Sequence, residues 1–112
     1  MASDEQPFDP KVLAELALFP ELNPGPVCRL SKEGVILRAN AAAQNAFSGK
    51  TLIGSSWFSH CKNVDGKTWR RILESSSTFP YESNVGDKII LFSYVCPPSH
   101  EFVFVYGLLL SL

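Results

Sequence analysis

Hydrophobic positions near the N-terminus repeat with a helical period. Asp9 is placed to cap a helix whose first position is Pro10, where the missing N–H costs nothing. Pro20 ends the pattern. The apolar side chains between them share one helical face: Val12, Leu13, Leu16 and Phe19. The sequence therefore predicts a helix with an apolar stripe that needs a covering surface.

A hairpin and an abrupt junction follow. Residues 27–39 predict two short strands around the turn formers at 31–34. Asn40 then stands directly before the alanine-rich stretch 41–47, and its side-chain oxygen is suited to accept the free N–H groups at a helix start. The small alanines keep the first turn slim, so we expect this helix to lie close against the sheet.

Two more helical segments are predicted before the period changes. The stretch 51–61 indicates a bend with one helical turn, and Asp65 is placed to cap a helix over residues 66–75. One face of that helix is apolar: Trp69, Ile72 and Leu73.

From Tyr81 onward the apolar positions alternate, which predicts three strands with turns at 86–87 and 97–100. The last two strands are apolar on both faces, whereas an antiparallel sheet with one wet face alternates more cleanly. We therefore expect the second face to be covered, either by the N-terminal helix or by another copy of the chain.

Composition narrows the function classes. The chain has 112 residues, of which 46% are hydrophobic, enough for one core. A net charge of -1 provides no basic footprint for nucleic acid or an anionic membrane. No apolar run approaches the roughly 20 residues that span a bilayer, and the start of the chain lacks a signal sequence. We expect a cytoplasmic protein with neither nucleic acid nor membrane as partner.

The residues that carry chemistry are sparse. Cys28, Cys61 and Cys96 are far apart and show no C-x-x-C pairing, which argues against a disulfide framework or a zinc site. No nucleophile, base and orienting residue recur at a recognisable spacing, and no glycine-rich phosphate loop is present. We expect no enzymatic activity, no catalytic residue and no metal site.

The order of these elements resembles that of a PAS domain. The matching segments are residues 23–47, "LIGSSW" at 52–57 and "FVFVYG" at 102–107, together with the pattern G-x-I-x-x-A-N-x-A-A that begins at Gly34. The resemblance implies an α+β fold, a five-stranded antiparallel sheet with helices on one face. It also implies a flanking helix over residues 1–22, a PAS domain over 23–107 and the start of a C-terminal connector over 108–112.

PAS domains are mostly sensory or dimerisation modules, so the resemblance implies a regulatory domain of a larger signalling protein. Its partners would be an effector domain, in the same chain or another protein, and a small-molecule ligand if a pocket is open. The last strand is expected to point Phe102, Phe104 and Tyr106 inward. Their expected neighbours on the helical side are Phe47, Trp57 and Trp69. These aromatic residues either line a ligand cavity or fill it.

The sequence can be compared with the motifs that bind cofactors in this family. Flavin-binding members carry a reactive cysteine in a G-x-N-C-R-F-L-Q motif, and Trp57 stands at that position here, with Cys61 several residues later. Haem needs an axial histidine, for which His60 and His100 are the candidates. We expect no bound chromophore, with haem through His60 as the alternative.

Self-association is the expected mode of action. PAS domains commonly dimerise through a flanking helix, and the apolar stripe of residues 12–19 would meet an outer sheet face that includes Val103 and Val105. A homodimer would bury both surfaces at once.

Overall fold

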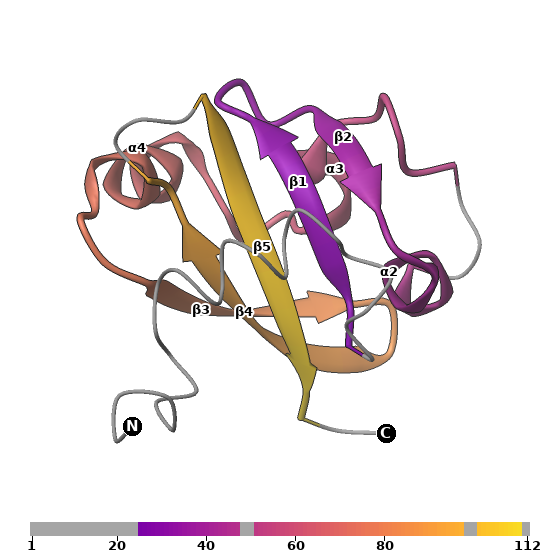
Figure 1. Ribbon diagram of the computed structural model, residues 1–112. Helices are drawn as coiled ribbons and strands as arrows, with labels where there is room; N and C mark the ends of the chain where they lie inside the picture. Colours follow the sequence, from indigo (N-terminus) through magenta and orange to yellow (C-terminus); the bar gives the residue numbers. More distant parts are fainter. Residues whose placement is uncertain (1–24, 48–50, 98–100, 111–112) are drawn as a thin grey trace, which may run out of the picture.

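The computed structural model of the protein describes residues 25–47, 51–97 and 101–110. Its central feature is an antiparallel sheet with the strand order β2-β1-β5-β4-β3 (Figure 1). The five strands are β1 (Val27–Ser31), β2 (Ile36–Ala39), β3 (Phe79–Val85), β4 (Lys88–Val95) and β5 (Phe102–Leu109).

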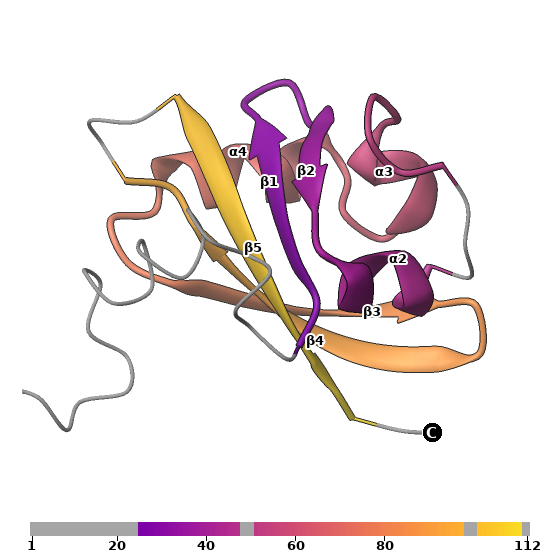
Figure 2. The ribbon, with the colours of Figure 1, turned by 45° about the vertical axis from the view of Figure 1, so that its right-hand side comes forward.

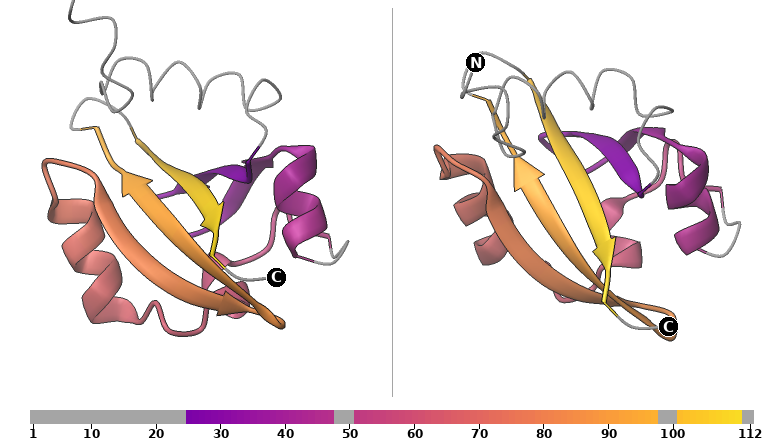
Figure 3. Two further views of the ribbon diagram at one scale, coloured as in Figure 1. Left: turned by 90° about the horizontal axis from the view of Figure 1, so that it is seen from below. Right: turned by 60° about the horizontal axis from the view of Figure 1, so that its bottom comes forward.

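Three helices connect the two halves of the sheet: α2 (Ala41–Ala46), α3 (Trp57–His60) and α4 (Gly66–Glu74). From the direction of Figure 1, α3 and α4 lie behind the sheet, and the turned view of Figure 2 brings α3 into sight beside β2. In the views of Figure 3, α4 lies beside the β3–β4 pair and α2 near the β1–β2 pair. The α+β class and the five-stranded antiparallel sheet are as predicted. The predicted helix with Val12, Leu13, Leu16 and Phe19 lies outside the described residues, as does His100.

Gly34 serves both the β1–β2 turn and the packing beneath it. Its φ of 88° lies in the left-handed region, which glycine adopts without strain. A Cβ at this position would come within 2.4 Å of the Phe58 ring in α3. Glycine therefore lets the hairpin turn tightly and lets α3 approach it.

Asn40 joins β2 to α2, as the sequence predicted. Its Oδ1 accepts hydrogen bonds from the backbone N–H of Ala43 at 2.9 Å and of Val27 at 3.0 Å, and its Nδ2 donates to the Gly25 carbonyl at 2.8 Å. The residue is only 3% exposed. One side chain thus caps the helix and fixes the chain that enters β1.

Backbone hydrogen bonds along β2 place α3. The Ile36 N–H donates to the Ser55 carbonyl at 2.9 Å, and the Gly54 N–H donates to the Ile36 carbonyl at 2.8 Å. The Trp57 N–H then donates to the Gly34 carbonyl at 2.8 Å. These bonds occupy part of the outer edge of β2 and hold Trp57 over the sheet.

The structure corrects the predicted orientation of β5. Val103 and Val105 belong to the core cluster beneath the helices, beside Leu30 and Cys28 of β1. The alternate residues point to the opposite face: Phe102, Phe104 and Tyr106. Both sets of side chains are apolar, so their alternation does not show which set faces the core. A shift of one residue would exchange the two faces. Since Val103 and Val105 are buried in the domain's own core, they are not available as an interface.

Strand β5 also runs two residues beyond the predicted domain end at Gly107. Leu108 pairs with Leu91 and Leu109 with Ile90 of β4, and the Leu110 N–H donates to the Ile89 carbonyl at 2.8 Å. The leucines predicted to begin a connector therefore start within the sheet.

We expect Asn40→Ala to lower the free energy of unfolding by roughly 2 to 4 kcal/mol. The loss exceeds that of a simple cap because the buried Val27 N–H also loses its acceptor. Thermal and urea unfolding measure it, with Gln44→Ala, an exposed position in the same helix, as the control. A loss for Asn40→Ala no larger than for Gln44→Ala would contradict this role.

Candidate functional site

The space between the helices and the sheet is occupied by aromatic side chains. Trp57 is fully buried, and its indole Nε1 donates a hydrogen bond to the Tyr94 hydroxyl at 3.0 Å. The Trp57 ring meets Phe92 edge-on at a centroid distance of 5.0 Å and Phe47 at 5.6 Å. Such edge-to-face contacts add to the stability gained from burial alone. The interior around Trp57 is therefore packed core.

Trp69 extends the same core from α4. Its ring lies 6.3 Å from that of Tyr94 and 5.2 Å from that of Phe58. Its Nε1 donates a 2.8 Å hydrogen bond to the Lys32 carbonyl, which ties α4 to the β1–β2 turn. The indole N–H is thereby satisfied within the protein.

The six predicted pocket residues divide between two places. The helical side of the sheet brings together Phe47, Trp57 and Trp69. The opposite face carries Phe102, Phe104 and Tyr106. The predicted single cluster therefore does not form.

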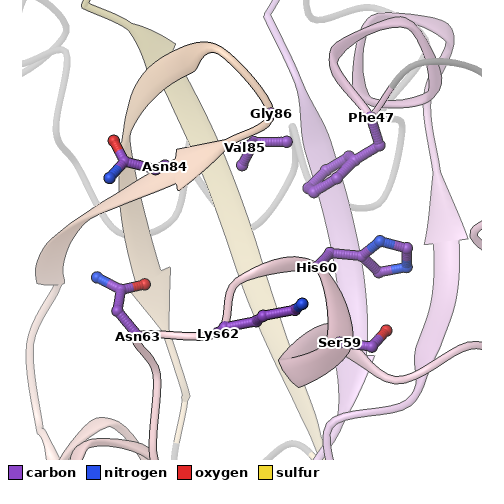
Figure 4. A pocket seen from close by; sticks show the side chains of 8 residues that line it. All are labelled: Phe47, Ser59, His60, Lys62, Asn63, Asn84, Val85 and Gly86. Atoms are coloured by element: carbon purple, nitrogen blue, oxygen red, sulfur yellow. The ribbon is translucent and has the colours of Figure 1, made fainter.

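A pocket of about 490 Å³ opens at the rim of the core (Figure 4). It lies between the end of α3 and the β3–β4 hairpin, with Phe47 from the end of α2 as a further wall. The lining residues are Phe47, Ser59, His60, Lys62, Asn63, Asn84, Val85 and Gly86. Its volume falls in the range of small-molecule sites.

Asn63 fixes the distance between the two sides of the pocket. Its Oδ1 accepts a hydrogen bond from Ser83 Oγ at 2.7 Å, and its Nδ2 donates to the Glu82 carbonyl at 2.8 Å. The Tyr81 hydroxyl donates to the Asn63 carbonyl at 3.2 Å. Because these bonds tie the segment after α3 to β3, the pocket is built into the fold.

His60 forms another part of the lining. The Ser55 hydroxyl donates its proton to the Leu52 carbonyl at 2.5 Å, so His60 Nε2, 3.0 Å from Ser55 Oγ, must be the donor of that pair. The imidazole also meets the Phe47 ring at 5.2 Å. Nε2 is therefore engaged in a structural hydrogen bond, which disfavours it as an axial ligand.

The buried cysteines have thiols of low reactivity. Burial raises the pKa of both the Cys28 and the Cys61 thiol to about 12. Since the thiolate is the nucleophile, neither is suited to covalent chemistry at neutral pH. No group of three or more histidine, cysteine or acidic side chains in the described ranges could hold a metal ion. Among the helices of those ranges, none is long and apolar enough to cross a bilayer.

Most of the pocket residues were not identified from the sequence. Phe47 was predicted as a pocket residue and His60 as a candidate ligand, but Lys62 and Asn84 were not singled out. The available local signal was the hairpin turn at Gly86, which was predicted and has a φ of 63°. Because the walls come from separate segments, their meeting depends on tertiary contacts.

No family model matches the sequence, and no curated protein matches it. Solved structures do match the fold. The PAS domain of an HTR-like protein from Haloarcula marismortui is 11% identical with a TM-score of 0.68, and the match covers 90% of this chain and 93% of that one.

Two further structures agree. The PAS domain of the quorum-sensing receptor RpfR from Cronobacter turicensis, in complex with C12:0, is 16% identical with a TM-score of 0.66, over 80% of this chain and 96% of that one. The PAS domain of nitrogen regulation protein NR(II) from Vibrio parahaemolyticus is 15% identical with a TM-score of 0.59, over 84% and 96%. The chain therefore has the PAS fold.

We expect a thiol reagent such as dithionitrobenzoate to modify Cys96 in the native protein at least about 100-fold faster than Cys28 or Cys61. Cys96 is half-buried, whereas the other two are buried. Cys96→Ser should remove the fast phase, and denaturant should expose the remaining thiols. Fast labelling of Cys61 in the native protein would contradict the packing described above.

Proposed function

We propose that this PAS-fold chain is a regulatory domain of a larger signalling protein that acts through protein–protein contacts without a bound chromophore. The observation that carries the proposal is the packed interior. Trp57, Phe92 and Tyr94 fill the space between α3 and the sheet, and the polar atoms of Trp57 and Tyr94 satisfy each other. A planar cofactor would have to displace this cluster.

The residues expected to react with a cofactor also argue for this reading. Trp57 stands where the flavin-binding members carry their reactive cysteine, and it is fully buried. Cys61, the nearest thiol in that stretch, is buried with a raised pKa. His60 Nε2, the candidate haem ligand, is engaged by Ser55.

Purified protein should be colourless, because a flavin or a haem in the interior would have to displace the packed cluster around Trp57. The measurement is an absorbance spectrum from 300 to about 700 nm after gel filtration, repeated after incubation with free haem or flavin mononucleotide. A Soret band or a flavin band that comigrates with the protein would overturn this part of the proposal.

The surface proposed to make the contacts is the outer face of the sheet, defined by Arg29, Leu91, Ser93, Phe102, Phe104, Tyr106 and Leu108. The Arg29 guanidinium lies over the rings of Phe102 at 5.2 Å and Phe104 at 5.9 Å. Phe104 is 1% exposed, whereas Leu108 is 61% exposed. The apolar surface that remains in water therefore lies at the C-terminal end of β5.

We propose that a second copy of the chain covers this end of the outer face. Leu108 lies beside the half-buried Leu91, and Leu110 is also exposed. A two-fold axis through such a patch would bury it on both copies, and each leucine moved out of water contributes about 1.5 to 3 kcal/mol. The predicted stripe of residues 12–19 remains a candidate contributor, whereas Val103 and Val105 do not.

Leu108→Glu is expected to weaken self-association at least about tenfold, since it would bury a carboxylate in the apolar contact. Sedimentation equilibrium measures the change. Ile53→Glu is the matched control, because Ile53 is 54% exposed but lies outside the sheet. A monomeric parent protein at tens of micromolar would refute the dimer. An unchanged dimer in Leu108→Glu would refute this interface.

A second candidate function is small-molecule sensing, favoured by the pocket between α3 and the β3–β4 hairpin. The RpfR PAS domain, which shares the fold, is in complex with C12:0 in its structure. Such a function requires only the rim pocket and leaves the packed interior intact.

A further inference from the structure

The rim pocket has an uneven distribution of charge. Lys62 is the one basic residue among its eight described lining residues apart from the imidazole of His60, and none of the eight is acidic. The acidic residue nearest in sequence, Asp87, follows Gly86 and lies 3.8 Å from the ammonium of Lys88. The lining therefore favours a negatively charged group near Lys62.

The lining amides differ in whether they are available to a ligand. Asn63 Nδ2 is already committed to the Glu82 carbonyl, and His60 Nε2 to Ser55. The Asn84 side chain is exposed and has no hydrogen-bond partner within the described part of the chain. Lys62 and Asn84 come from opposite sides of the pocket, the segment after α3 and strand β3 (Figure 4). Asn84 lies on the face of β3 opposite the buried Val85, and its amide points away from the Lys62 ammonium (Figure 4). Lys62 is therefore the donor that a ligand in the pocket meets.

The other part of the pocket is apolar. Phe47 is 3% exposed and Val85 6% exposed, and both belong to the core cluster. A ligand that fills the pocket therefore meets the edge of the core on one side and the Lys62 ammonium on the other. This pairing suits a molecule with a compact apolar body and a charged head.

We propose that the rim pocket binds a small organic acid with a single carboxylate and an aromatic or branched body. Lys62 holds the carboxylate, and Phe47 and Val85 contact the body. One ammonium balances the single charge of a carboxylate, whereas a phosphate monoester carries about -1.5 to -2 and would leave an excess of negative charge. The inference deepens the second candidate function and is independent of the proposed dimer.

The test is a titration of the full chain by backbone amide NMR, with phenylacetate as the probe. Saturable shifts are expected at Lys62 and at residues 84–86. Phenylacetamide, which has the same shape without the charge, should bind about tenfold more weakly, since a hydrogen bond to a charged group stabilises more than one to a neutral group. Phenyl phosphate should bind no more tightly than phenylacetate.

Two variants locate the effect. Lys62→Gln should weaken phenylacetate binding about tenfold and leave phenylacetamide binding unchanged. Lys67→Gln is the matched control, since Lys67 is exposed on α4 and does not line the pocket. Both sites are exposed, so neither variant should alter the unfolding midpoint.

Several outcomes would overturn the inference. They are an absence of saturable shifts up to about 20 mM phenylacetate, equal affinity for phenylacetate and phenylacetamide, tighter binding of phenyl phosphate, and equal effects of Lys62→Gln and Lys67→Gln. Shifts confined to other parts of the chain would also overturn it. None of these outcomes bears on self-association, which sedimentation of the same samples measures separately.

Discussion

Three hydrogen bonds that the Asn40 side chain makes within the described part of the chain are the constraint on which much of the domain depends. They connect the chain that enters β1, at Gly25 and Val27, with the first turn of α2, at Ala43. Because α2 is only six residues long, its direction is set at its start, and its end places Phe47. Phe47 then contacts Trp57 in the core and His60 at the rim. A single buried polar side chain thus sets both the packing of the interior and one wall of the pocket.

Local signals in the sequence predicted the junctions well. Asn40 and Asp65 cap their helices, and the turns at Gly34 and Gly86 adopt positive φ, because caps and turns depend on residues close in sequence. The orientation of β5 could not be predicted in the same way. Both of its faces are apolar, so alternation does not reveal which one meets the helices. The structure resolves this through its cross-strand partners, which place Val105 opposite Cys28 on the core side.

The pocket could not be predicted from the sequence, for a different reason. The hydrogen bonds that Asn63 makes with Glu82 and Ser83 bring the segment that carries Lys62 beside β3. Asn63 is an exposed asparagine after a short helix, and no local sequence pattern indicates that role. The indoles of Trp57 and Trp69 were expected to line or to fill a cavity, and the structure has them in packed core. Large rings occupy the centre, and a pocket opens at the rim, where smaller polar side chains meet.

The rim pocket and the exposed leucines both adjoin strand β4. Val85 and Gly86 line the pocket at the β3–β4 turn, and Ile89, three residues after Gly86, accepts a hydrogen bond from Leu110. A ligand held by Lys62 and in contact with Val85 would therefore touch the hairpin whose second strand, β4, pairs with the end of β5. Proximity alone is not coupling, because a ligand shifts an equilibrium only if it binds the two states differently. The hairpin meets that condition only if its turn can move while Asn63 holds β3 in place. Asn63 holds β3 at Glu82 and Ser83, and the turn at Gly86 lies beyond these residues. Coupling would then require this turn to be the part that moves.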